Sequence, residues 1–324
     1  MSKWAFAILG VCLILGGCAN NNAEVAQAKP PDPCKQLSAP RVANQPRYRQ
    51  LTISLGSSGD APTKLSQDDL KINTGNQEIP VQFFQQEAVS VGILVDTSGS
   101  MDPKMRQART TLAELIDGLN PDDEAFLMAF SSRPFMLQAF TSNHTWLKRR
   151  VDLLHAFGQT SLFDSTIQGL RLVERGCYEH KALFLMTDGI DNTSSVNQSA
   201  MLAAVKESKV RIFALGIGNE EPQRALFIGP FALGGDNANT VDARTLRSLA
   251  DTSGGKSYIL PELGNAKAKQ TALAIANGID NHYAIGFVAP ANSRIQIELL
   301  HHSGATLKID SAPPGVTVVK LSRS

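Results

Sequence analysis

Five oxygen-bearing side chains of this sequence stand at the ends of apolar or amphipathic segments, where side chains from different segments can meet. Two are carboxylates and three are hydroxyls, so together they offer only hard oxygen ligands. Such ligands suit a divalent cation, and Mg²⁺ in particular is held by few protein groups and keeps waters or a partner's oxygen. We therefore expect a Mg²⁺ site, with Mn²⁺ or Ca²⁺ as alternatives, whose ligand shell the chain leaves incomplete. The five residues are Asp96, Ser98, Ser100, Thr160 and Asp188.

The positions of these residues favour convergence on one point. The first three alternate directly after the apolar run 89–95, the threonine lies in a loop at 158–164 that opens a helix, and the last carboxylate follows the run 181–187. In open α/β sheets, ligands bind beyond the carboxyl ends of the strands. An alternative is that Asp96 and Ser98 only cap the helix that follows, because Asp and Ser are preferred N-cap residues.

The segments that must position these residues alternate between short apolar runs and helical periods. Continuous apolar strands separated by amphipathic helices specify a mostly parallel sheet that is covered on both faces. We therefore expect an α/β core with a doubly wound sheet. Strands are expected at 89–95, 125–130, 182–186 and 210–217, and helices at 103–119, 145–154, 162–175, 199–209, 242–251 and 263–277.

The segments on both sides of this core have strand character and are separated by turn-forming residues. We expect them to form one small β-rich appendage to which both flanks contribute. The expected strands lie at 47–55, 70–72 and 79–84 before the core, and at 282–288, 294–300, 306–309 and 316–321 after it.

The order Asp-x-Ser-x-Ser, then Thr, then Asp-Gly resembles the metal-ion-dependent adhesion site of a von Willebrand factor A domain. The resemblance covers roughly residues 88–281, and all five metal-site positions match. The flanks at 65–72 and 281–287 are similar to the bacterial VWFA-related (Acidobacterial-type) branch, in which β-rich segments surround the A domain. The resemblance implies a bound metal whose free coordination position accepts an Asp or Glu carboxylate from another protein.

Two further features bear on the expected site. Asp191, Asn192 and Ser194 follow its last carboxylate and could support the metal ligands, although turn chemistry explains these residue types equally well. A long loop at 218–241 follows a strand and should lie on the metal side of the sheet. We expect its apolar residues either to shape a partner surface or to pack over the sheet edge. They are Leu226, Phe227, Ile228, Phe231 and Leu233.

The N-terminus has the pattern of an export signal. Lys3 precedes the apolar run 4–15, which is shorter than the roughly 20 residues of a membrane-spanning helix, and small residues follow. The sequence Leu-Gly-Gly-Cys at 15–18 resembles a bacterial lipobox, which implies cleavage before Cys18 and acylation of that cysteine. Because several acyl chains anchor stably, we expect a lipoprotein attached to the membrane by lipid alone. Ala19 rather than Asp after the cysteine resembles bacterial lipoproteins that are released to the outer membrane. We expect the chain there, facing the periplasm.

The remaining cysteines raise the question of a disulfide. Residues 18–40 are poor in apolar side chains and read as a flexible tether. This tether contains Cys34, and the core contains Cys177. An oxidising compartment permits a bridge between them. Two free thiols, with Cys177 buried, are the alternative.

Composition and motifs give no support to several functions. Lys and Arg number 31 against 30 Asp and Glu, so there is no basic excess for a nucleic-acid partner. A hydrolase would need Ser98 or Ser100 as its nucleophile, but the sequence has no Gly-x-Ser-x-Gly elbow and no evident set of His plus acid. No P-loop motif occurs either.

We therefore expect a non-enzymatic, lipid-anchored protein-binding module of the cell envelope that uses Mg²⁺ to engage an acidic residue of a partner protein in adhesion. A structural or assembly lipoprotein with a stabilising metal is the alternative, and a metal-assisted hydrolase is a third interpretation. The expected organisation is a signal peptide at 1–17, a tether at 18–40, an N-terminal β segment at 41–87, the A domain at 88–281 and a C-terminal β segment at 282–324.

Overall fold

The computed structural model describes residue 34 and residues 47–57, 64–188, 190–220, 227–228, 231–232, 240–290, 292–300, 305–314 and 316–321. The chain divides into two units, residues 1–38 and residues 39–324. Within the first unit only Cys34 is described. The expected signal peptide and the acylated Cys18 therefore lie outside the described residues.

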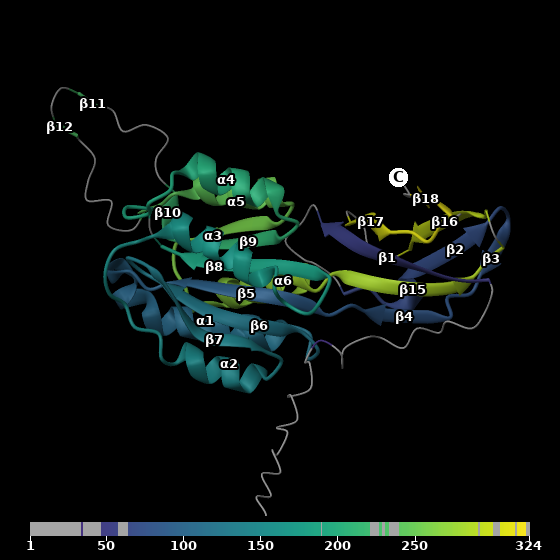
Figure 1. Ribbon diagram of the computed structural model, residues 1–324, viewed down its shortest axis with the longest axis horizontal. Coiled ribbons are helices and arrows are strands. Elements are labelled where there is room, and N and C mark those ends of the chain that lie inside the picture. The colour runs from purple at the N-terminus through teal and green to yellow at the C-terminus, as the bar shows by residue number, and fades with distance from the viewer. Residues whose placement is uncertain are drawn as a thin grey trace, which may run out of the picture. The chain divides into compact units, whose positions relative to one another are not determined.

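A six-stranded sheet forms the centre of the second unit, in the order β14-β9-β8-β5-β6-β7 (Figure 1). Five strands run parallel, and β7 pairs antiparallel with β6 at one edge. Every residue of β5 is buried, as expected for an apolar strand with helices on both faces of the sheet. The strands are β5 (Val89–Asp96), β6 (Glu124–Phe130), β7 (Pro134–Thr141), β8 (His180–Thr187), β9 (Arg211–Ile217) and β14 (Lys256–Leu260).

In the described residues, six α-helices and one 3₁₀ turn cover the two faces of this sheet. Buried side chains of α1, α2 and α6 form one apolar core with the sheet, and those of α3, α4 and α5 form a second core on the opposite face. The predicted α/β fold with a doubly wound, mostly parallel sheet is therefore confirmed. The helices are the 3₁₀ turn η3 (Gly99–Lys104), α1 (Met105–Gly118), α2 (His144–Val151), α3 (Leu162–Val173), α4 (Gln198–Glu207), α5 (Ala243–Ser253) and α6 (Ala266–Ile279).

The flanks build two four-stranded sheets, β17-β1-β15-β4 and β18-β16-β2-β3, each with strands from both ends of the chain. Apolar side chains from both sheets form a third core, so the two sheets pack face to face. This β-rich appendage comprises β1 (Tyr48–Ser57), the 3₁₀ turn η2 (Gln67–Asp69), β2 (Leu70–Thr74), β3 (Gln77–Ile79), β4 (Phe83–Gln86), β15 (His282–Val288), β16 (Arg294–Leu299), β17 (Ala305–Ser311) and β18 (Thr317–Leu321).

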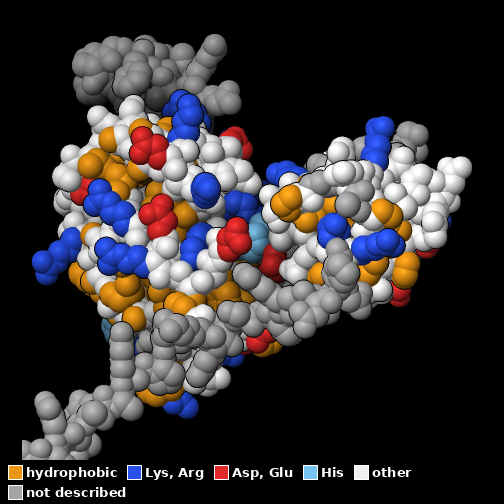
Figure 2. All heavy atoms as spheres, turned by 45° about the vertical axis from the view of Figure 1, so that its right-hand side comes forward, with side chains coloured by type: hydrophobic (Ala, Val, Ile, Leu, Met, Phe, Trp, Pro, Cys, Tyr) orange, Lys and Arg blue, Asp and Glu red, His pale blue; other side chains and the backbone are white. Residues whose placement is uncertain are grey.

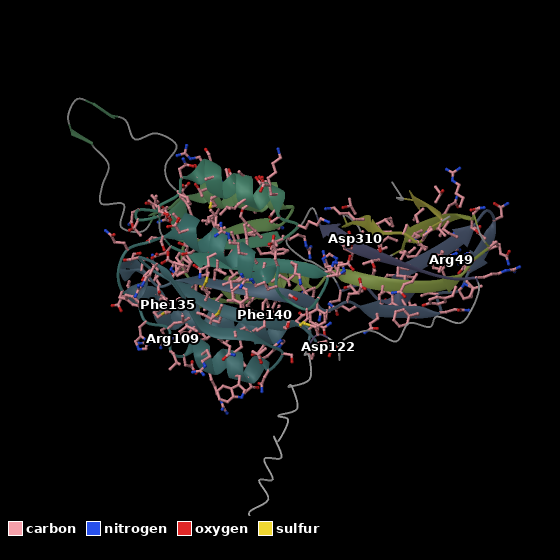
Figure 3. All side chains as sticks on the ribbon, viewed as in Figure 1. Arg49, Arg109, Asp122, Phe135, Phe140 and Asp310 are labelled. Carbon is pink, nitrogen blue, oxygen red and sulfur yellow. The ribbon has the colours of Figure 1, made fainter. Side chains whose placement is uncertain are left out.

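Aromatic side chains cover the β7 edge of the central sheet. Phe140 contacts Phe126 edge to face, with ring centroids 5.1 Å apart, and Phe135 packs against Phe157 at 5.9 Å. Figure 3 shows Phe135 and Phe140 at separate positions along this edge. Strand β7 is half-buried and pairs with β6, and its aromatic residues add packing contacts to this pairing.

The long loop after β9 is described only in part. Asn219–Glu220 (β10) pairs with Thr240–Val241 (β13), and Phe227–Ile228 (β11) pairs antiparallel with Phe231–Ala232 (β12). Leu226 and Leu233 lie outside the described residues.

Membrane-spanning helices and surface charge can be assessed for the described residues and for the face shown in Figure 2, respectively. Among the helices of the described ranges, none has both the length and the apolar character needed to cross a bilayer. Figure 2 shows acidic and basic side chains interspersed on the face in view. This distribution agrees with the near balance of charges in the sequence, 31 basic against 30 acidic residues.

Candidate metal centre

Asp96 is the last residue of β5, which lies between the parallel strands β6 and β8. Its carboxylate is fully buried and accepts two hydrogen bonds, from the hydroxyl of Thr187 at 2.5 Å and from the backbone N–H of Ser98 at 2.8 Å. Thr187 ends the neighbouring strand β8, and Asp188 follows it directly. The parallel order of the strands therefore brings both predicted carboxylates to one edge of the sheet.

The predicted hydroxyls connect these two carboxylates. The Oγ atoms of Ser98 and Ser100 are 3.1 Å apart, and Ser100 Oγ donates to Asp188 Oδ1 at 2.8 Å. Ser98 occupies the N-cap position of η3 but makes no capping hydrogen bond with its side chain. Asp96, Ser98, Ser100 and Asp188 thus form one group, which we call the oxygen cluster. The hydroxyl of Ser98 faces this cluster rather than the helix end, so helix capping does not account for the position of Ser98.

Thr160 reaches the same edge through backbone contacts of its loop. The N–H of Gly99 donates to the carbonyl of Gly158 at 3.0 Å, and the N–H of Phe157 donates to the carbonyl of Thr97 at 2.7 Å. Gly158 has a φ of +75°, a left-handed conformation that favours glycine. Thr160 itself is buried. These contacts hold the threonine loop against the loop that carries the first carboxylate and the two serines.

The residues after Asp188 stabilise this arrangement in two ways. Asn192 Oδ1 accepts from the N–H of Thr160 at 2.9 Å and so holds the threonine's backbone. The N-cap residue of α3 makes no side-chain capping bond. Instead, Ser194 Oγ accepts from the N–H groups of Phe163 and Asp164 at 3.1 Å each. Asn192 thus holds the loop of Thr160 in place, and Ser194 caps the N-terminus of α3, a helix to which it does not belong.

Lys104 is a member of the cluster that the sequence analysis did not identify. Its Nζ donates to Asp188 Oδ2 at 2.6 Å. The side chain of Asp188 is fully buried, and that of Lys104 is 19% exposed. One cation already contacts the cluster in this position, since the ammonium of Lys104 is bound to the carboxylate that is expected to ligate the metal.

The electrostatics of Asp96 fit a site for an added cation. The pKa of Asp96 is raised to about 6, mainly by burial and to a smaller extent by the negative charge of Asp188, while hydrogen bonds from Thr187 and Ser98 act in the opposite direction. A buried carboxylate of this kind gains most from a nearby positive charge. In the described part of the chain, no group of three or more His, Cys, Asp or Glu side chains is placed to hold a metal.

The donor set nevertheless fits Mg²⁺, because this ion needs few protein ligands and takes hydroxyl oxygens together with carboxylates. Asp96, Ser98, Ser100 and Asp188 are the residues that would hold it, with Thr160 alongside. Ser100 is exposed, so the cluster is open to solvent on one side.

The other predicted site residues have mixed outcomes. Cys34 and Cys177 are both disulfide-bonded, as the predicted pairing requires. Phe227, Ile228 and Phe231 belong to the short strands β11 and β12, and no observation connects them to a partner.

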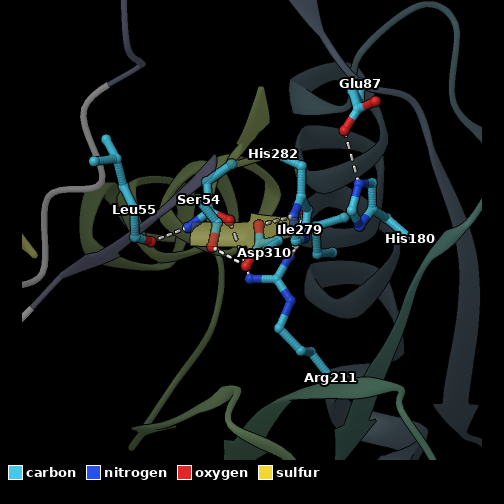
Figure 4. Close-up of polar contacts among 9 residues, drawn as sticks. Ser54, Leu55, Glu87, His180, Arg211, Ile279, His282 and Asp310 are labelled. Atoms are coloured by element: carbon cyan, nitrogen blue, oxygen red, sulfur yellow. Dashed lines mark hydrogen bonds and ion pairs between the residues drawn. The ribbon is translucent and has the colours of Figure 1, made fainter. Parts of the chain in front are cut away.

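A second polar cluster lies at the amino ends of β8 and β9 (Figure 4). Arg211 donates to the carbonyl of Ile279 at 2.9 Å, to Asn281 Oδ1 at 3.0 Å and to His282 Nε2 at 2.6 Å. Because its Nε2 accepts from the guanidinium, His282 is neutral and donates through Nδ1 to Asp310 Oδ2 at 3.2 Å. Burial lowers the pKa of His282 to about 4.

The same end of the domain contains two more pairs of titratable groups. The ring of His180 stacks on that of His282 at a centroid distance of 3.8 Å, and its Nε2 lies 2.9 Å from Glu87 Oε2. Asp123 and Asp280 are buried neighbours, and burial raises the pKa of both, that of Asp123 further through the adjacent Asp280 carboxylate. Arg211, His180, His282, Glu87 and Asp310 form what we call the junction cluster, in which the polar groups have partners from the chain itself.

The fold and the first cluster define a class of protein: a doubly wound α/β domain with an oxygen-donor site at the carboxyl edge of its sheet. The family model of the von Willebrand factor type A (VWA) domain matches residues 90–270. The chain therefore belongs to the VWA domain family. Domains of this family generally mediate protein–protein interactions, often with a bound metal ion.

Two curated relatives match about half of this chain. Inter-alpha-trypsin inhibitor heavy chain H4 from Bos taurus is 27% identical over 205 residues, which cover 55% of this chain and 22% of the relative. The Homo sapiens protein of the same name is 26% identical over 159 residues, which cover 43% and 17%. The chain thus spans about a fifth of the length of these relatives.

Solved structures resemble the chain in fold alone. A von Willebrand factor type A structure from Catenulispora acidiphila has a TM-score of 0.48 at 15% identity and covers 81% of this chain and 73% of that chain. The conserved hypothetical protein BatB from Bacteroides thetaiotaomicron has a TM-score of 0.45 at 17% identity and covers 59% and 98%.

Proposed function

We propose that this chain is an exported, lipid-anchored protein-binding module that uses a divalent cation to engage an acidic residue of a partner protein. The cation is Mg²⁺, or Mn²⁺ or Ca²⁺, and the proposed role is binding without catalysis. The anchor is the acylated Cys18, and the proposed location is the outer membrane, facing the periplasm. The cation, when bound, supplies an electrophilic coordination position for the carboxylate of the partner.

The observation that carries this proposal is the convergence of two carboxylates and two hydroxyls at the ends of β5 and β8. Asp96 and Asp188 provide negative charge, and the serines provide neutral oxygens. Two carboxylates do not saturate the ligand shell of a divalent cation, so an outside carboxylate adds both charge and an oxygen. The exposure of Ser100 leaves a path for that carboxylate from solvent.

Apolar side chains beside the cluster support a protein as the partner. Phe157 is 53% exposed, and Ile190 is 42% exposed. The N–H of Phe157 donates to the carbonyl of Thr97, the residue after Asp96. Ile190 follows Asp188 by two residues. Protein interfaces combine aromatic and aliphatic contacts with a few polar groups at fixed positions. A partner segment with an acidic residue and apolar neighbours fits this surface.

Calorimetric titration of Mg²⁺ and Mn²⁺ into the metal-stripped full chain tests the metal. We expect saturable binding that Asp96→Asn and Asp188→Asn each abolish, because the amide keeps the size of the side chain but removes its charge. Asp152→Asn is the matched control, since Asp152 is an exposed carboxylate after α2. Absence of binding by the wild-type chain contradicts the proposal.

The partner chemistry needs a separate test. Immobilised peptides that each present one Asp or Glu should retain the chain in Mg²⁺, and chelator or the Asn or Gln counterpart of each peptide should prevent retention. If metal binds but changes only the stability of the chain, a structural or assembly role is favoured. Metal-dependent turnover of a substrate panel would instead favour a hydrolase.

A further inference from the structure

Lys104 lies where two helical segments meet. It is the last residue of η3 and the N-cap residue of α1, which continues for 14 residues to Gly118. A cation is favoured at the C-terminus of a helix and disfavoured at the N-terminus, so the two helix dipoles have opposing effects on this lysine. Its side chain forms an ion pair with Asp188 at 2.6 Å, and Asp188 is fully buried. This ion pair is therefore the main interaction of the ammonium.

The contacts of Asp188 show what the lysine occupies. Oδ1 of this carboxylate accepts from Ser100, and Oδ2 accepts from the ammonium of Lys104. A divalent cation that binds Asp188 approaches the same oxygens. An ammonium and a divalent cation repel each other strongly at contact distances in a partly buried site. The lysine and the metal therefore compete for one carboxylate.

We propose that Lys104 is an internal competitor that lowers the affinity of the site for its metal ion, so that metal binding requires the ammonium to leave Asp188. This inference rests on the proposed metal-dependent function and adds a regulatory element to it. The lysine neutralises Asp188 when metal is scarce and sets the concentration at which the site fills. A merely positioning role for Lys104, holding Asp188 ready for the metal, predicts the opposite sign of its effect on affinity.

Calorimetric titration of Mn²⁺ into the full-length wild type, Lys104→Met and Lys104→Arg tests the competition. Methionine keeps the length of the side chain without its charge, and we expect it to tighten Mn²⁺ binding about tenfold or more, given the strength of charge interactions in partly buried sites. Arginine keeps the charge, and we expect an affinity within about threefold of the wild type. Circular dichroism of each variant confirms that it folds.

Lys148→Met is the matched control. Lys148 also pairs with a carboxylate, Asp117, at 2.5 Å, and its side chain is partly exposed. Asp117 is in the last turn of α1, at the other end of that helix from Lys104. The control removes one positive charge and one ion pair without touching the cluster, so we expect its Mn²⁺ affinity to equal that of the wild type.

Amine labelling read by mass spectrometry gives a second measurement without any substitution. If metal displaces the ammonium of Lys104 from Asp188, saturating Mg²⁺ increases the labelling of Lys104 and leaves that of Lys148 unchanged. Equal or weaker Mn²⁺ binding by Lys104→Met, or unchanged labelling of Lys104 in the presence of metal that binds, overturns the competition and leaves the metal site intact. Failure of both the wild type and Lys104→Met to bind metal overturns the proposed function and the competition together.

Discussion

At the carboxyl ends of β5 and β8, the carboxylates and hydroxyls contact one another and one lysine, whereas at the amino ends of β8 and β9 the charged groups have fixed partners. In the described structure, the side chain of Asp188 is hydrogen-bonded to Ser100, which is exposed to solvent, and to Lys104. Arg211, by contrast, is partly buried and donates to three acceptors. The same sheet thus carries a cluster that can accept an added ion and a cluster that the chain completes by itself.

This difference shows how burial and partner number separate a binding role from a structural one. A buried charged group whose partners all come from the chain contributes to stability, and its removal leaves them unpaired. A cluster of like charges with few partners is suited to binding a ligand that brings the opposite charge. Substitutions at the two ends should therefore affect different measurements, stability at the junction cluster and metal binding at the oxygen cluster.

The largest effect is expected from Arg211→Met. The variant leaves His282 Nε2, Asn281 and the carbonyl of Ile279 without their donor, so we expect a loss of about 3–5 kcal/mol in the free energy of unfolding. Urea denaturation measures this loss. Arg171→Met, at an exposed position in α3, should stay within about 0.5 kcal/mol of the wild type. Equal stabilities of the two variants would remove the contrast between the clusters.

The next effect concerns the oxygen cluster. Mg²⁺ at a hundred times its dissociation constant should raise the free energy of unfolding of the wild type by about 2.7 kcal/mol, because the ion binds only the folded state. Thermal unfolding with and without Mg²⁺ measures the shift. Asp188→Asn should show no shift, and Arg171→Met should show the full one. A shift that survives in Asp188→Asn would place the bound ion elsewhere.

The third effect is the pH dependence that His282 confers. Its pKa falls from an ordinary 6.5 to about 4 in the folded chain, so folding favours the neutral ring. The resulting stability is complete above pH 6.5 and is lost as the pH falls toward 4. Between pH 7.5 and pH 5 the loss attributable to His282 should be about 2 kcal/mol.

Comparison with His282→Gln isolates this contribution. Asp123 and Asp280 have raised pKa values, so their effect has the opposite sign, with stability greatest at low pH and lost as the carboxyls ionise. Both carboxyls remain in His282→Gln, and only the histidine contribution disappears. Urea denaturation at the two pH values measures it. His155→Gln, at an exposed position, should keep the wild-type pH dependence.

Much of the central fold was predictable because its inner strands are buried on both faces. β5 and β6 are buried at every position and appear in the sequence as continuous apolar runs. The two strands of the sheet that the sequence did not indicate are β7 and β14, which form its two edges. Both are mainly half-buried, so they have neither a continuous apolar run nor clear alternation. A strand is therefore predictable from the order of apolar and polar residues only where its burial requires a regular order.

The same reasoning explains which polar residues were predictable. Asp96 and Asp188 were identified because each directly follows a buried strand, and the serines because they alternate after the first. Lys104 was missed because its partner lies 84 residues away and no local spacing links the two. The contact between Arg211 and His282 likewise joins separate segments, 71 residues apart. Contacts of this kind follow from topology, which a single sequence does not specify.

The smallest effect on stability is expected from removing one serine hydroxyl at each of the two clusters. Ser54→Ala removes the donor to Asp310 Oδ1 at 2.9 Å from a buried position in β1, and Figure 3 shows Asp310 among the strands of the β-rich appendage. Loss of this hydrogen bond, from a buried hydroxyl to a partly exposed carboxylate, should cost about 1–2 kcal/mol of unfolding free energy. Ser100→Ala removes the donor to Asp188 Oδ1, so its cost should be of similar size, about 1–2 kcal/mol, while its Mg²⁺ affinity by calorimetry falls severalfold. Ser54→Ala should keep the Mg²⁺ affinity of the wild type. If Ser100→Ala also kept that affinity, its hydroxyl would be structural and the two clusters would be of one kind.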